Sequence, residues 1–168
     1  MRNSQELSQI FSNPEQDVRI NVTLDGTEFT IILEQNAVRL FPEDKRKQTN
    51  NYFSATVDSE GYFECEVVSK RDGLGRKLPG FYAKEITVLA FQYLSQRNNV
   101  QGFKGVWRRK VSESDNFRQF NENKLKKHLP IEEAALNTWT GQIAQELGYT
   151  QVRITTDDPS YLWVYFTR

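Results

Sequence analysis

Gly73 and Gly75 stand between two pairs of cations, Lys70-Arg71 and Arg76-Lys77, in the stretch KRDGLGRKLPG, residues 70–80. Glycine lets the backbone approach a ligand closely, and backbone N–H groups beside cationic side chains form a good cradle for an anion. This pattern predicts a binding site for a phosphorylated ligand. The alternative is a mobile basic turn with no ligand. The predicted ligand-binding residues are Lys70, Arg71, Gly73, Gly75, Arg76 and Lys77.

Two carboxylates precede this loop in a strand-like run. Glu64 and Glu66 alternate with apolar residues, so they fall on one face of the predicted strand. Paired carboxylates can act as general acid and base, which makes both residues candidate catalytic groups. On an exposed sheet face the same pattern serves only to keep the surface soluble.

A second candidate anion site lies in the sequence NTWTG, residues 137–141. Asn, Thr and Gly all weaken a helix, yet this stretch lies inside a helical pattern. In one interpretation the helix breaks here, and Thr138 or Thr140 caps a new N-terminus that faces an anion. In the other, the helix kinks so that Trp139 can pack and Gly141 can approach a neighbour.

Aromatic and basic residues also occur together at positions 107–110. Trp107 can stack on a base while Arg108, Arg109 and Lys110 neutralise phosphates, which would suit a nucleic acid. In the alternative interpretation, Trp107 ends a strand as a core residue, and the charged residues that follow it are simply exposed to solvent. His128, the only histidine, is either a general base or a cation that stabilises the end of a helix.

The net charge of zero hides an uneven distribution of charge along the chain. Residues 1–69 carry 6 Lys/Arg and 12 Asp/Glu, residues 70–127 carry 14 and 5, and residues 128–168 carry 2 and 5. The three net charges are therefore −6, +9 and −3. A basic middle segment predicts an anionic partner, either a small molecule or a nucleic acid. Docking of this segment on the acidic ends of the same chain is the alternative.

Length and composition indicate what kind of protein this is. The 168 residues predict a single domain, 1–168, and the 38% hydrophobic content is enough for a core. One cysteine, Cys65, permits no internal disulfide, and no cysteine–histidine set predicts a metal site. The N-terminus has no apolar leader and the longest apolar run is ITVLAF. We therefore expect no membrane span and a soluble, cytoplasmic protein.

Hydrophobic periodicity predicts the elements that must position these residues. Residues 1–69 alternate as a β-meander, with Asp25-Gly26 as the strongest hairpin signal. Residues 70–168 predict a helix over 81–96, a strand ending at Trp107, two helical stretches after Ser114, and a terminal hairpin. The resulting class is α+β, with a mostly antiparallel sheet and three to four packed helices. The helix over 81–96 also permits one parallel strand pair through a crossover.

The order of elements after residue 60 resembles the core of the GNAT acyltransferase superfamily. A strand, a basic residue, a Gly-x-Gly loop, a helix, a strand and a helix ending in Leu-Gly-aromatic are followed by a hairpin. The family loop falls on Lys70, Gly73 and Gly75, and its Gly-aromatic pair falls on Gly148-Tyr149. The resemblance implies a coenzyme A cofactor whose pyrophosphate is held by the loop, and N-acyl transfer as a possible activity, with Glu64 or Glu66 as base. Pro79 delays the helix, so backbone donors would hold most of the ligand.

The C-terminal half carries a second resemblance. The segments SDNFRQFN and IEEAALNTWTGQIAQELGY, followed by a hairpin ending in VYFTR, are similar to uncharacterised modules at the C-termini of bacterial polymorphic-toxin proteins. Three functions therefore stand as expectations. They are a GNAT-like domain that binds acyl-coenzyme A or a similar anion, a nucleic-acid-binding or nucleic-acid-cleaving module of the toxin type, and a protein-interaction domain without catalysis.

Overall fold

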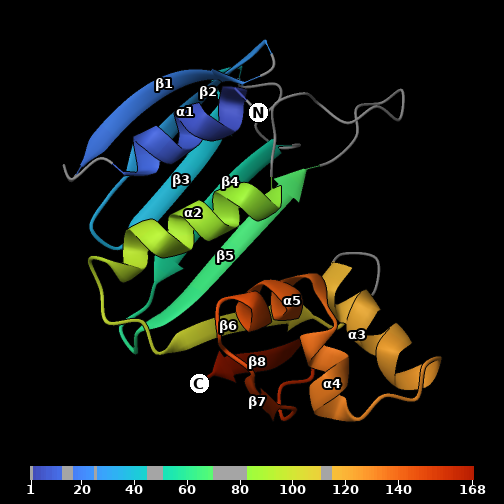
Figure 1. The fold of residues 1–168 in the computed structure, drawn as a ribbon. Helices are drawn as coiled ribbons and strands as arrows, with labels where there is room; N and C mark the ends of the chain where they lie inside the picture. Colours follow the sequence, from blue (N-terminus) through green and yellow to red (C-terminus); the bar gives the residue numbers. More distant parts are fainter. Residues whose placement is uncertain (1, 13–16, 25, 45–50, 70–82, 111–114) are drawn as a thin grey trace. The chain divides into compact units, whose positions relative to one another are not determined.

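The computed structural model describes residues 2–12, 17–24, 26–44, 51–69, 83–110 and 115–168 (Figure 1). Within these ranges the chain forms five helices and eight strands, and most strand pairs are antiparallel. This confirms the predicted α+β class. The chain divides into two compact units. One comprises residues 1–59 with 65–100, and the other comprises residues 60–64 with 101–168.

The first unit is built on the predicted β-meander. Strands β1 (Val18–Leu24), β2 (Thr27–Leu33), β3 (Ala37–Pro42) and β4 (Asn51–Val57) pair in antiparallel order, and β5 (Tyr62–Ser69) follows β4. Gly26 has φ of +81°, as a tight turn between β1 and β2 requires. Gly61 has φ of +89° in the turn that precedes β5. The hairpin turn predicted at Asp25-Gly26 therefore lies between β1 and β2.

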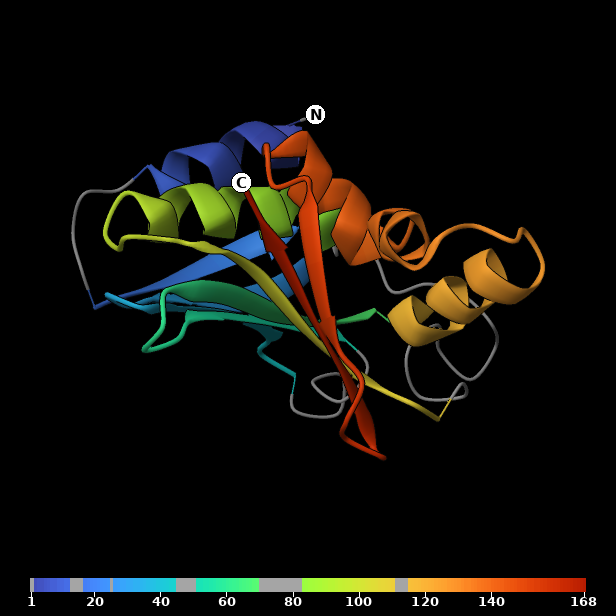
Figure 2. The same ribbon diagram turned by 90° about the horizontal axis from the view of Figure 1, so that it is seen from below.

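Helices α1 (Arg2–Phe11) and α2 (Ala83–Ser95) lie side by side on one face of this sheet (Figures 1 and 2). Burial alternates along β1, β3 and β4, so one face of these strands is buried more than the other, while β2 also buries Thr30 on its second face. The core of this unit includes Leu24, Phe29, Ile31, Leu33, Val38, Leu40, Phe53, Ile86, Ala90 and Leu94.

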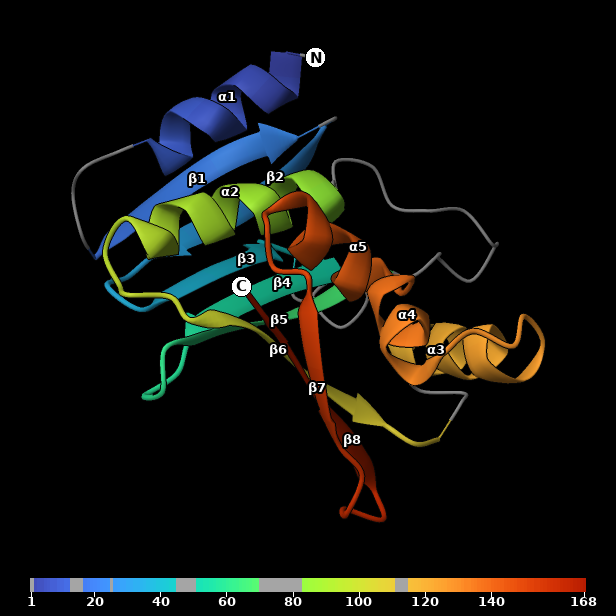
Figure 3. The same ribbon diagram turned by 60° about the horizontal axis from the view of Figure 1, so that its bottom comes forward.

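The second unit contains the start of β5, together with β6 (Gly102–Arg108), β7 (Gln151–Thr155) and β8 (Tyr161–Thr167). The first residues of β5 pair in parallel with β6, at Tyr62–Gly102 and Phe63–Phe103. Because α2 connects β5 to β6, this is the parallel crossover that the sequence permits. Strand β8 lies between β6 and β7 and is antiparallel to both. The predicted terminal hairpin is therefore β7–β8 (Figure 3).

Three helices pack on one face of the strands in this unit: α3 (Asp115–Leu125), α4 (Ile131–Leu136) and α5 (Trp139–Glu146). The ring of Trp107 lies 6.1 Å from that of Phe120 on α3, and the ring of Phe103 lies 5.6 Å from that of Tyr149. Leu162, Val164 and Phe166 of β8 complete the core. The helices thus cover the face that carries the odd-numbered residues of β6 and the even-numbered residues of β8.

The helical stretch over residues 131–146 is two helices rather than one. Thr138 has extended backbone angles, φ −86° and ψ 168°, and serves as the N-cap of α5. Of the two sequence interpretations, the structure therefore shows the broken helix. The break brings two backbones together, since a Cβ placed on Gly141 would lie 2.2 Å from the Ala135 carbonyl oxygen.

This close approach makes a specific prediction for stability. Gly141→Ala would add a methyl group against backbone atoms of Ala135 and Leu136, which cannot rotate away. Overpacking costs roughly 1–3 kcal/mol, while Gly→Ala inside a helix gains at most about 1 kcal/mol. We expect the free energy of unfolding in urea to fall by about 2 kcal/mol. Gln142→Ala, on the exposed side of α5, is the control and should change it little. Unchanged or higher stability for Gly141→Ala would contradict the packing described.

Candidate functional site

The six residues predicted to bind a phosphorylated ligand, within residues 70–77, lie outside the described part of the chain, as the grey trace in Figure 1 shows. Strand β5 ends before them at Ser69, and α2 begins after them at Ala83. Glu85 lies in the first turn of α2 and accepts a hydrogen bond from Ser4 Oγ at 3.1 Å. A carboxylate there disfavours a second anion, so the start of α2 is a poor phosphate site.

The two candidate catalytic carboxylates have different partners. Glu64 Oε2 lies 3.5 Å from Lys104 Nζ, in an ion pair between β5 and β6. Glu66 accepts a hydrogen bond from the Tyr52 hydroxyl on β4. Each carboxylate therefore has its own partner on a neighbouring strand. Either could act as a base only if that partner allowed it, so the pair is a weaker catalytic candidate than its spacing indicates.

The Tyr52–Glu66 contact affects how Tyr52 titrates. Burial, the hydrogen bond to Glu66 and the negative charge of Glu66 together raise the pKa of Tyr52 from 10.0 to about 12. The folded protein thus holds this proton more tightly than the unfolded chain does. The associated stability is complete below pH 10 and is lost as the pH rises from 10.0 to about 12.

Glu66→Gln should lower the pKa of Tyr52, because the substitution removes the charge and weakens the hydrogen bond while burial remains. We expect a value between 10.0 and 12, measured by NMR titration of tyrosine labelled at Cζ. Tyr52→Phe identifies the resonance among the seven tyrosines. The stability of Glu66→Gln should also fall less steeply between these two pH values. An unchanged Tyr52 pKa would show that Glu66 does not control it.

The second candidate anion site, at Thr138 and Thr140, is fully hydrogen-bonded. Thr138 Oγ1 donates to the Ala135 carbonyl oxygen at 2.7 Å and accepts from the Gly141 N–H at 3.0 Å. The Trp139 N–H donates to Gln119 Oε1 at 2.7 Å, and the Thr140 N–H donates to Asn116 Oδ1 at 3.0 Å. The first-turn donors of α5 are thus used by oxygens of its own cap and of α3. An anion could bind here only by displacing these side chains.

This network makes Thr138 important for stability. Thr138→Ala removes the cap and both of its hydrogen bonds in a buried position, so we expect a loss of about 1–2 kcal/mol in the free energy of unfolding. Thr138→Ser keeps the hydroxyl and should recover most of this loss. Chemical denaturation of the three proteins measures the effect. Equal loss in both variants would show that the methyl group, and not the cap, is what stabilises the break.

The four residues predicted to bind nucleic acid, 107–110, do not share one surface in the structure. Trp107 is buried, with 4% of its surface exposed, so its ring faces the core. Arg109 donates from Nε to the Asp158 carbonyl oxygen and from Nη2 to that of Thr156, both at 2.9 Å, and so fixes the β7–β8 turn. Arg108 and Lys110 are exposed.

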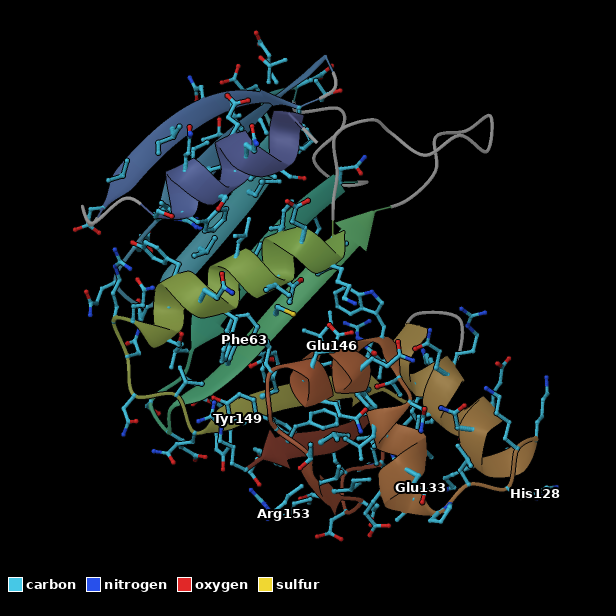
Figure 4. The ribbon with its side chains drawn as sticks, in the orientation of Figure 1. Phe63, His128, Glu133, Glu146, Tyr149 and Arg153 are labelled. Carbon is cyan, nitrogen blue, oxygen red and sulfur yellow. The ribbon has the colours of Figure 1, made fainter. Side chains whose placement is uncertain are left out.

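His128 is exposed beyond the end of α3 and has φ of +53°, in the left-handed region (Figure 4). The structure gives it no acid or base partner among the described residues that would single it out as a general base. Within the described ranges there is also no group of three or more His, Cys, Asp and Glu residues that could hold a metal ion.

Sequence reasoning missed the most distinctive surface of the second unit. The sheet face away from α3, α4 and α5 carries the alternate residues of β5, β6, β8 and β7, and the strand pairing places them in adjacent positions. We call this set the open face. Its members are Tyr62, Glu64, Lys104, Val106, Arg108, Arg153, Thr155, Tyr161, Trp163 and Tyr165.

Aromatic rings and cations are in contact across the open face. The rings of Tyr62 and Tyr165 meet edge to face at 5.0 Å. The Arg153 guanidinium lies 4.0 Å from the centre of the Tyr165 ring, and Lys104 Nζ lies 5.8 Å from that of Trp163. Figure 4 shows Arg153 projecting from β7 on the side away from α5. The arrangement can bind a flat, anionic ligand, because rings offer stacking surfaces and cations lie beside them.

A signal for this face was present in the sequence. The segment YLWVYFT, residues 161–167, alternates Tyr, Trp and Tyr with Leu, Val and Phe. Such alternation is typical of a strand with one core face and one aromatic outer face. That Tyr62 and Lys104 belong to the same face could not be predicted from local sequence, because it depends on which strands become neighbours.

A small cavity in the first unit lies between α1 and α2. Its lining includes Ser8, Phe11, Gln92 and Tyr93. The Tyr93 hydroxyl is buried and has no hydrogen-bond partner within the described residues. Burial raises the pKa of Tyr93. The lining is polar and aromatic, and it holds no group of catalytic residues.

Comparisons with family models, with curated proteins and with solved structures gave no match to this chain. No helix in the described ranges is both long and apolar enough to cross a membrane.

Proposed function

We propose that this chain is a GNAT-like domain that binds acyl-coenzyme A or a similar phosphorylated ligand at the loop formed by residues 70–77. The observation that carries the proposal is the path of the chain through β5, α2 and β6, in which β5 and β6 pair in parallel. In such a crossover the loop that leaves the first strand lies at its carboxyl end and leads into the helix, a common position for an anion site.

Two further features support the proposal. Helix α5 ends in Leu147-Gly148-Tyr149, where Gly148 has φ of +92°. Tyr149 is buried against Phe103 of β6, so the Gly-aromatic pair closes the helix onto the sheet. The β7–β8 hairpin follows directly. These features support the resemblance, although α3, α4 and α5 stand where the resemblance has a single helix between the strand and the hairpin.

The loop itself, rather than α2, would hold the ligand. Glu85 in the first turn of α2 places a negative charge where a helix otherwise attracts an anion. The glycine N–H groups and the side chains of Lys70, Arg71, Arg76 and Lys77 would then supply the donors. We propose binding as the primary function. Acyl transfer is a further possibility in which Glu64 or Glu66 would serve as base, through water, after release from Lys104 or Tyr52.

Calorimetric titration with coenzyme A tests this proposal. We expect Gly73→Ala/Gly75→Ala to weaken binding more than Lys70→Ala, because two Cβ atoms block close approach while one lost charge leaves three cations. Lys70→Ala should cost roughly tenfold in affinity, from one charge-assisted hydrogen bond. Glu85→Gln is the matched control, and its affinity should stay near that of wild type. Much tighter binding by Glu85→Gln would place the phosphate at the helix instead. If neither wild type nor any variant binds coenzyme A, at low or at high salt, the loop is only a basic turn and the proposal is wrong.

A nucleic-acid module of the polymorphic-toxin type stays a prediction for the C-terminal half. The four residues first predicted to carry it do not act as a unit, because Trp107 is buried and Arg109 binds the β7–β8 turn. Other residues of the same unit present the chemistry that a nucleic acid needs.

A further inference from the structure

We propose that the open face of the second unit binds single-stranded nucleic acid, with bases stacked on its aromatic rings and phosphates beside its cations. This site uses residues of β5, β6, β7 and β8, and none of the loop residues 70–77. The proposal therefore does not depend on coenzyme A binding, and either proposal can fail alone.

The first argument is the placement of the rings. Tyr161, Trp163 and Tyr165 are alternate residues of β8 and so project from the same face of the sheet. Tyr62 of β5 joins them through its edge contact with Tyr165. All four side chains are half-buried, which fixes their orientation while part of each remains accessible. A row of rings on a sheet is a stacking platform that accepts bases of any sequence.

The second argument is the placement of charge. Three cations occur on the open face, namely Lys104, Arg108 and Arg153. Two carboxylates approach it: Glu64 pairs with Lys104 at 3.5 Å, and Asp158 Oδ2 accepts from the Trp163 indole N–H at 3.5 Å. Glu66 follows Glu64 on the same face of β5, so the face is close to neutral overall, and its attraction for a phosphate comes from the cations placed beside the rings. The cations lie beside the rings, so a phosphate next to a stacked base would meet one.

The third argument concerns the form of the ligand. In a duplex the faces of the bases are stacked on one another and are not accessible to a flat surface of rings. A single strand exposes these faces, and its flexible backbone can follow the row of residues along β8. The Arg153 guanidinium lies over the Tyr165 ring and Lys104 Nζ lies over that of Trp163, so a base that stacks on either ring would move the cation aside and leave it next to the adjoining phosphate. A single strand is therefore the ligand that fits.

Fluorescence anisotropy with labelled oligonucleotides of about 12 nucleotides, within the roughly 4–16 that a single-strand-binding domain covers, tests the proposal on the full chain. One arm uses oligouridine RNA, one uses oligothymidine DNA, and one uses a duplex. We expect saturable binding of single strands that weakens with salt, and much weaker binding of the duplex. Comparison of the RNA and DNA arms shows which of the two single-stranded nucleic acids the face prefers. Failure of both single strands to bind at low salt would overturn the proposal, as would equal binding of the duplex.

Two pairs of variants separate stacking from general attraction. Tyr165→Ala removes a stacking ring and should weaken binding roughly fivefold or more, whereas Tyr165→Phe keeps the ring and should bind like wild type. Arg108→Ala/Arg153→Ala removes two cations of the open face and should reduce the salt slope by about 1.4. Lys126→Ala/Lys127→Ala removes two exposed cations beyond α3 and is the matched control. Equal losses in the two double variants would overturn the proposal.

Circular dichroism and thermal unfolding establish that each variant is folded. If Tyr165→Ala does not fold, a second measurement decides. Intrinsic fluorescence should be quenched by the oligonucleotide in wild type, and this quenching should be largely lost in Trp163→Phe, since Trp107 is buried and Trp139 lies on α5, which packs on the other face of the sheet. Undiminished quenching in Trp163→Phe would contradict stacking at this face. Gly73→Ala/Gly75→Ala should bind oligonucleotides like wild type, which separates this site from the loop. A dimer that depends on Tyr165, without oligonucleotide binding, would show that the face joins two copies instead.

Discussion

The alternation of side chains along β8 is the constraint on which most of the second unit depends. Strand β8 pairs with β6 from Gly102–Thr167 to Arg108–Tyr161, and with β7 on its other edge. A strand bonded on both edges cannot shift by one residue without reversing every side chain. The register that buries Leu162, Val164 and Phe166 therefore also fixes Tyr161, Trp163 and Tyr165 on the opposite face. The pairing of β8 with its neighbours thus determines both the core residues and the residues of the open face.

The fold was largely predictable from local signals. Asp25-Gly26 marked the first hairpin, the periodic apolar residues over 81–96 predicted α2, and alternation predicted β7–β8. These features are local, because turn chemistry and periodicity act within a few residues. The partners of Glu64 and Glu66 were not predictable. Both carboxylates are on one strand, yet one pairs with Lys104 and the other with Tyr52, since each lies beside a different neighbouring strand.

The break between α4 and α5 shows why a weak helix signal has two interpretations. Asn, Thr and Gly at 137–141 indicate poor helix formers, and both a kink and a break are consistent with that. Long-range contacts select the break. Gln119 and Asn116 of α3 accept from the first N–H groups of α5, and Asn123 Nδ2 donates to the Ala134 carbonyl oxygen at 3.0 Å. The N–H groups at the start of a helix can therefore be satisfied by side chains of a neighbouring helix instead of by an anion.

The position of β8 has a consequence for the order in which the chain can fold. A ribosome delivers β6 first, then three helices, then β7, and only afterward the strand that lies between β6 and β7. Among the residues that the structure describes, β7 pairs with β8 alone and β6 pairs with β8 and with the start of β5, so both lack a partner on one edge until β8 emerges. Closing a pairing between residues so far apart is slow, because the chain must lose loop entropy before the contacts form. The same strand that completes the core thus leaves two strand edges temporarily open to other chains during synthesis.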